Sequence, residues 1–363
     1  MKLSRFTIAL FIILFLIVSL VLISDTNRRN ENRRIDFSES PGSGTAIIMT
    51  GAAARITQQV ALLEELYNRG VLKDVVFISG VSSGALNAVM LNAILSGKLT
   101  WQEYKDILFN IRNSDIYLSG EGKLPVNTGP SRKLLTEVVE GKLGYRTIGD
   151  LPIMTEISFS NFSGLKTRQR VFRMCSRKIN SESDTTLNLV DILMASTAIP
   201  VVFPPARIGN VSTIPDIEYT DGGVGIDYIP FTALLDFQKW RGERVKNVYI
   251  ISRTFGVFDE FSQEMKMLGI NNKGRIDRIG TSLDNIIWWI MINRLEAFAR
   301  EAPEMINGSY VWIPHLEQDF LMLNFDNLEE QYFITKSWAQ SNDPVPLGDF
   351  ILYNKLTKGG KRF

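Results

Sequence analysis

Two kinds of reactive side chain are almost absent from this sequence: it has one histidine, His315, and one cysteine, Cys175. A single cysteine excludes an intramolecular disulfide and a cysteine-based zinc site. A single histidine leaves only one residue for any mechanism that needs an imidazole base. Cys175 ends the run 170–175, whose alternating residues predict a strand, so we expect a buried structural thiol there.

The chain also lacks an excess of charge of either sign, because 40 lysine and arginine residues nearly balance 39 aspartate and glutamate residues. No overall basic field indicates nucleic acid as a partner, and we expect none. The length of 363 residues suits one large domain or two modest ones. No segment resembles a calcium-binding loop, and we expect neither a metal nor an organic cofactor.

The first 34 residues predict a membrane anchor. Nineteen consecutive residues, from Phe6 to Ser24, carry no charge, and as a helix they span roughly 28 Å, about one hydrocarbon core. A secretory signal peptide is the alternative, but its apolar region is usually about 7–15 residues long, and Leu22 and Ser24 form a poor cleavage site. We expect an uncleaved single-pass anchor in residues 1–34, and the arginines after the span slightly favour a cytoplasmic catalytic domain.

The remaining chain divides into three parts. Residues 35–44 have the serine, proline and glycine content of a linker, 45–345 are expected to form a catalytic domain, and 346–363 a basic tail. Strand-like runs alternate with helical patterns, which predicts an α/β fold with a largely parallel sheet. The expected strands are 45–50, 72–79, 154–160, 170–175, 247–252 and 309–314. The expected helices are 54–68, 85–97, 101–111, 131–140, 187–195 and 281–300.

The stretch 75–88 contains a recognisable catalytic pattern. A run of strand-forming residues leads into Gly80-Val81-Ser82-Ser83-Gly84 and then into a helical segment rich in small residues. This strand–turn–helix order is typical of a nucleophile elbow, in which a strained turn exposes the serine hydroxyl at a helix N-terminus. The pattern predicts Ser82 as a nucleophile, with Gly80 and Gly84 keeping side chains away from the turn.

A nucleophilic serine needs a base, and two arrangements are open. A Ser-His-Asp triad must use His315, which gives the Ser…Asp…His order of α/β-hydrolases. A Ser–Asp dyad instead uses Asp221, which ends a short strand before Gly222 and Gly223. Two glycines expose a carboxylate and let another backbone segment come close. The simpler interpretation of Asp221 is an ordinary Asp-Gly turn.

Four segments, taken in order, resemble the patatin-like phospholipases, a family of lipid acyl hydrolases. The resemblance covers roughly residues 45–314 and implies a three-layer patatin-like fold with a Ser–Asp dyad at strand ends, formed by Ser82 and Asp221. It also implies membrane glycerolipids as substrates, phospholipase A-type cleavage of acyl esters through an acyl-serine, and no cofactor. The segments are Gly51-Ala52-Ala53-Ala54-Arg55-Ile56, Gly80-Val81-Ser82-Ser83-Gly84, Ala195-Ser196-Thr197-Ala198-Ile199-Pro200 with Phe203-Pro204, and Asp221-Gly222-Gly223 with Pro230.

The resemblance further implies an oxyanion hole made by the backbone N–H groups of Gly51, Ala52 and Ala53, with Arg55 supporting the loop or approaching a lipid phosphate. The family loop is usually Gly-Gly-Gly-x-Arg/Lys-Gly, so alanine stands here where glycine is usual. Alanine keeps the N–H but reaches positive φ only with strain of about 1 kcal/mol or more. A catalytically weak lipid-binding relative therefore stays open, beside a serine esterase that uses His315.

Overall fold

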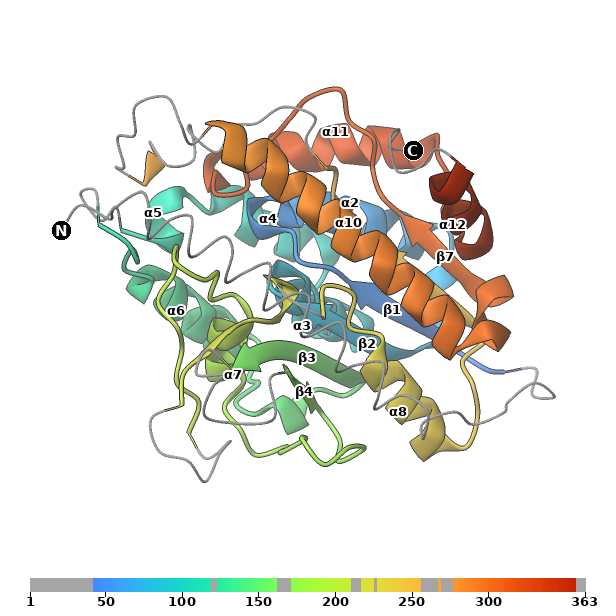
Figure 1. The fold of residues 1–363 in the computed structure, drawn as a ribbon. Coiled ribbons are helices and arrows are strands. Elements are labelled where there is room, and N and C mark those ends of the chain that lie inside the picture. Colours follow the sequence, from blue (N-terminus) through green and yellow to red (C-terminus); the bar gives the residue numbers. More distant parts are fainter. Residues whose placement is uncertain are drawn as a thin grey trace.

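The computed structural model describes residues 42–118, 123–161, 171–209, 217–224, 227–255, 267–268 and 277–356 (Figure 1). The predicted membrane span, 6–24, lies outside these ranges, as do most of the predicted linker and the end of the predicted basic tail. Within the described ranges, no helix has the length and apolar character needed to cross a membrane.

A mainly parallel sheet forms the centre of the molecule (Figure 1), which confirms the predicted α/β class. Its strands are β1 (Thr45–Met49), β2 (Val75–Val81), β3 (Met154–Asn161), β4 (Val171–Cys175), β5 (Tyr219–Asp221), β6 (Asn247–Ile251), β7 (Ser309–Trp312) and β8 (Val345–Pro346). The order is β4-β3-β2-β1-β6-β7-β8, with β5 paired to β3. The inner strands from β3 to β7 are parallel, whereas β4, β5 and β8 pair antiparallel.

Helices cover both faces of this sheet and complete three layers. One face carries α2 (Ile56–Asn68), α3 (Ser83–Leu95), α4 (Trp101–Asn110), α7 (Leu189–Ser196) and α11 (Leu328–Gln340). The other carries α8 (Thr232–Arg241), α10 (Asp277–Glu301) and α12 (Leu347–Leu356), and Figure 1 shows α10 crossing in front of β1. The strands alternate accordingly: Ile47 and Met49 pack with α2 and α3, whereas Ala46 and Ile48 pack with α8 and α10.

Shorter helical segments connect these layers. Between α4 and β3 the chain forms two short helices and a π-helix; α6 and the π-helix lie beside α7, and α5 lies beside α6. The short segments are α5 (Asn113–Ile116), α6 (Gly129–Leu135), the π-helix Thr136–Lys142 and the 3₁₀ turns Ala53–Arg55, Val71–Asp74, Ile148–Asp150, Gly222–Val224, Pro303–Gly308 and Phe325–Asn327.

Within the described residues, the structure adds the short α5 and three longer helices to those that the sequence patterns predicted: α8, α11 and α12. α12 occupies residues that were expected to start the basic tail, and its Leu347 and Phe350 are buried in the layer with α10. At the other end, the Ser43 N–H donates to the carbonyl of Arg244 at 3.1 Å, so the last linker residues lie against the fold. Cys175 is a buried free thiol in β4, as predicted.

Candidate active site

Chain segments that leave adjacent strands meet at the carboxyl edge of the parallel sheet. β1 has β2 on one side and β6 on the other, so its end is a topological switch point, where α/β proteins commonly bind ligands. Gly51 follows β1, and Ser82 follows the neighbouring β2. β5 pairs with the end of β3, where Asp221 lies opposite Phe159. The sheet thus brings Gly51, Ser82 and Asp221 to one place.

Ser82 occupies a strained turn between β2 and α3, with φ 58° and ψ −133°. A Cβ at Gly80 would lie 2.2 Å from the carbonyl oxygen of Gly84, and a Cβ at Gly84 would lie 2.5 Å from that of Thr50. Both contacts are too short for any side chain. The two glycines are therefore needed because strand and helix backbones touch at the turn, which fixes the direction of the Ser82 side chain.

The Ser82 hydroxyl lies close enough to the Asp221 carboxyl to lower its pKa, and Oδ1 of Asp221 accepts a hydrogen bond from the Gly223 N–H at 2.7 Å. Both residues are buried; Asp221 is 3% exposed and Ser82 is 5% exposed. Burial raises the pKa of Asp221 from 3.8 to about 7, and the Ser82 hydroxyl and the Gly223 N–H oppose part of that rise. A carboxyl that titrates near neutral pH can take a proton from the serine it contacts.

Gly222 and Gly223 let this loop close on the sheet. A Cβ at Gly222 would lie 3.1 Å from backbone atoms of Phe159, and one at Gly223 would lie 3.1 Å from Oδ1 of Asp221. Contacts of this length are tighter than ordinary van der Waals packing, so larger residues would push the loop away from β3. The carboxylate would then move away from Ser82.

The two alanines at positions 52 and 53 of the predicted oxyanion loop differ in backbone conformation. Ala52 has φ −135° and ψ −10°, on the side of φ that alanine adopts without penalty, whereas Ala53 has φ 48°. The Ala52 N–H donates to the hydroxyl of Ser83 at 2.8 Å. The N–H groups of Gly51 and Ala53 have no acceptor among the described residues. These two groups, and not that of Ala52, are thus available to an oxyanion.

Three side chains for which the sequence predicted no role hold the elbow and the loop together. Ser83 accepts the Ala52 N–H, as described above. Ser196 accepts the Ser82 N–H at 2.9 Å and donates to the carbonyl of Ser158 on β3 at 2.7 Å. Tyr228 donates to the carbonyl of Gly51 at 3.1 Å. Ser83 and Ser196 lie inside motifs that the sequence reveals, but no pattern marks Tyr228.

The guanidinium of Arg55 forms its contacts inside the protein. Its side chain is buried, and its guanidinium donates to the carbonyl of Phe320 through Nε at 2.8 Å and Nη2 at 2.6 Å. It also pairs with Asp284 at 3.2 Å, and the same carboxylate pairs with Arg253 at 2.8 Å. These contacts tie the end of the predicted oxyanion loop to residues 284 and 320 elsewhere in the fold.

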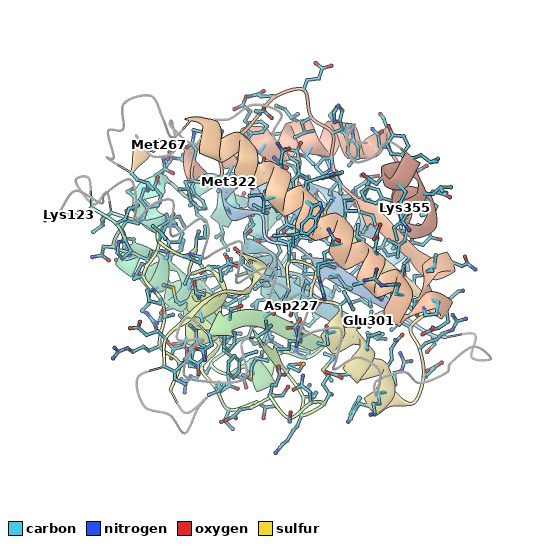
Figure 2. All side chains as sticks on the ribbon, viewed as in Figure 1. Lys123, Asp227, Met267, Glu301, Met322 and Lys355 are labelled. Carbon is cyan, nitrogen blue, oxygen red and sulfur yellow. The ribbon has the colours of Figure 1, made fainter. Side chains whose placement is uncertain are left out.

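A second buried carboxylate, Asp227, anchors the chain that follows Asp221. Figure 2 shows it inside the molecule near β3, and it is fully buried. It accepts hydrogen bonds from Ser158 at 2.6 Å and from Arg173 on β4 at 2.9 Å. Burial alone raises the pKa of Asp227, but the guanidinium groups of Arg173 and Arg294 outweigh burial and hold it below its usual value. An ionised Asp227 fixes the loop to the sheet.

His315 lies apart from these groups. It follows β7, its side chain is exposed, and it does not line the cavity next to Ser82. Within the described residues, no hydrogen bond or ion pair joins it to Ser82 or Asp221.

An apolar cavity of about 110 Å³ opens beside Ser82. Aliphatic side chains from α3, α4, α6 and α7 form most of its wall, and the oxyanion loop contributes Ala53. A hydrocarbon chain can therefore enter next to the serine without burying an unpaired polar group.

The fold and the site define a class: α/β proteins in which an elbow serine contacts a buried carboxyl beside an apolar cavity. The sequence profile described as patatin-like phospholipase matches residues 44–235, more than half of the chain, and the protein belongs to this family. Membership implies lipid acyl hydrolase activity. No curated protein matches the chain significantly.

Two solved structures are similar over most of this chain. VipD from Legionella pneumophila has a TM-score of 0.36 and 11% identity, and the match covers 83% of this chain and 68% of VipD. The type III effector protein ExoU has a TM-score of 0.34 and 13% identity, and the match covers 83% of this chain and 54% of ExoU. The chain therefore spans about half the length of ExoU.

Proposed function

We propose that the protein is a phospholipase A-type lipid acyl hydrolase in which Ser82 and Asp221 form the catalytic dyad. The observation that carries this proposal is the proximity of Ser82 to a buried carboxyl whose pKa burial raises to about 7, next to an apolar cavity. The predicted anchor in residues 6–24 would hold the site at the membrane that contains the substrate.

In the first step, the Ser82 oxygen attacks the carbonyl carbon of a glycerolipid acyl ester, and ionised Asp221 takes the hydroxyl proton. The N–H groups of Gly51 and Ala53 stabilise the oxyanion, and the N-terminus of α3 adds a favourable field. Asp221 then returns the proton to the leaving alcohol. In the second half of the reaction, Asp221 takes a proton from water and the resulting hydroxide attacks the acyl-serine. The proton then passes from Asp221 to the Ser82 oxygen as the fatty acid leaves.

The exposed position of His315 favours this dyad over a triad, because a base must lie within hydrogen-bonding distance of the hydroxyl it serves. The Ala53 N–H also bears on the hypothesis of a weak, lipid-binding relative. The loop reaches positive φ despite the alanine, so that N–H group remains available as a donor.

The test compares the full chain in detergent with Ser82→Ala, Asp221→Asn and His315→Gln, on a soluble butyryl ester and on phosphatidylcholine vesicles. We expect kcat/KM to fall by at least ~10³-fold for the first two variants, because each removes a group that acts in the transition state. His315→Gln should stay within about twofold of the parent.

The outcomes separate the three hypotheses. Loss of activity in His315→Gln but not in Asp221→Asn would overturn the dyad and favour the triad. An inactive parent that still binds vesicles would identify a lipid-binding relative. Release of free fatty acid from the vesicles, measured by chromatography, distinguishes a phospholipase from an esterase that cleaves only the soluble ester.

A further inference from the structure

The cavity beside Ser82 follows one face of α3. This helix begins directly after Ser82, and Leu86 and Met90 line the cavity together with the serine. Residues four apart in a helix lie one above the other on the same face. An acyl chain whose carbonyl carbon sits at Ser82 thus passes Leu86 first and Met90 second.

Met90 lies one helical turn beyond Leu86 on this face, and Tyr104 of α4 also lines the cavity. Tyr104 is 3% exposed, and its hydroxyl donates to Oδ1 of Asn87 at 2.6 Å. The Asn87 amide in turn donates to Oε1 of Gln59 at 2.9 Å, so the tyrosine ring is held by a buried chain of hydrogen bonds. Met90 is equally buried but carries a flexible thioether, which makes it the adaptable part of the wall.

The helix rise gives the length of this path. Eight residues separate Ser82 from Met90, which corresponds to about 12 Å at 1.5 Å per residue. An extended alkyl chain advances roughly 1.25 Å per carbon for bonds of about 1.5 Å and angles near 111°. The path therefore accommodates on the order of ten carbons.

We propose that Met90 limits the length of the acyl group, so that the enzyme prefers esters of medium-chain acids of about eight to ten carbons. This inference rests on the proposed function, because it places the acyl carbonyl at Ser82. Met90 is a specificity-determining residue in this scheme and takes no part in the chemistry.

The test measures kcat/KM of the full chain for p-nitrophenyl esters from acetyl to palmitoyl, at one fixed ratio of detergent to ester. We expect a rise of up to about fourfold per added carbon, since each carbon buries one more methylene group. The maximum should fall near eight to ten carbons, with at least a tenfold drop at sixteen. Met90→Phe should move the maximum two to four carbons shorter, and Met90→Ala should move it two or three carbons longer.

The control is Met154→Phe, the same substitution at a methionine that is 7% exposed, lies on β3 and does not line the cavity. Its chain-length profile should match that of the parent. If both Met90 variants keep the parental maximum, the inference is wrong although acetyl and butyryl esters are still hydrolysed. If the parent hydrolyses neither short ester, the proposed function itself fails. If Met90→Phe does not fold, Met90→Ala still tests the inference, because this substitution only removes atoms from the cavity wall.

Discussion

At the scale of single residues, the burial of Asp221 decides whether a carboxyl can serve as the base. An exposed aspartate titrates near 3.8 and holds a proton too weakly to take one from a serine at neutral pH. Burial raises the pKa of Asp221 to about 7, which brings its basicity close to that of a histidine. In the proposed mechanism, Asp221 therefore takes the place of a histidine base in a chain whose one histidine is exposed.

The first prediction concerns pH. The base must be ionised, so kcat/KM for a soluble butyryl ester should rise about tenfold per pH unit below 7 and level off above it. The measurement is a pH–rate profile of the full chain at fixed ionic strength. An inflection near 4, or none between pH 5 and 9, would contradict the assignment of Asp221 as the base.

The free energy of unfolding provides a control, because the contribution of Asp221 to it changes with pH in the direction opposite to kcat/KM. The folded-state pKa of Asp221 lies above its unfolded value of 3.8, so the native state binds more protons between pH 4 and 7. The contribution of this group is therefore fully present below about pH 4 and is lost as the pH rises through 7. Activity and this part of the stability should change in opposite directions over the same interval.

At the scale of elements, the oxyanion loop depends on strain in one residue. Ala53 has φ 48° in a region that glycine adopts freely and alanine does not. Its neighbour Ala52 avoids the problem with φ −135° and binds Ser83. The surrounding contacts from Ser83 and Tyr228 hold the loop in place against this strain.

The second prediction is that Ala53→Gly stabilises the protein. Removing the Cβ relieves about 1–2 kcal/mol of strain, partly offset by about 0.4–1 kcal/mol from the extra freedom of glycine in the unfolded chain. We expect a gain of about 0.5–1 kcal/mol, measured as a higher midpoint of denaturation. Ala52→Gly is the matched control and should lower the midpoint, since φ at that position already suits alanine. A lower midpoint in Ala53→Gly would show that the loop is not strained.

The elements that the sequence predicts are those with local signals. The run before Gly80 and the small residues after Gly84 define β2, the turn and α3 from neighbours along the chain. The contacts that complete the site are not local: Ser196 bonds to Ser82 from 114 residues away, and Tyr228 bonds to Gly51 from 177 residues away. No hydrophobic period marks such pairs, because they depend on how the sheet places its strand ends.

At the scale of the whole molecule, a buried cluster of ion pairs joins the two helical layers at the carboxyl edge of the sheet. Arg55 stands at the start of α2 on one face, and Asp284 belongs to α10 on the other. Arg253, which follows β6, pairs with the same carboxylate, and its side chain is 2% exposed. Asp284 therefore links the oxyanion loop, the central sheet and the opposite layer.

The last prediction is that Asp284→Asn strongly destabilises the fold. Two buried guanidinium groups lose the carboxylate they share, and breaking a buried pair typically costs about 3–5 kcal/mol. The control is Asp343→Asn, which also removes a carboxylate from an arginine, here Arg69, but at a side chain that is 91% exposed; such pairs contribute about 1 kcal/mol or less. Thermal unfolding of the full chain in detergent should show a drop of about 6 °C or more for the first variant and about 2 °C or less for the second. Equal shifts would mean that the layers are held at this edge by hydrophobic packing and not by the ionic group.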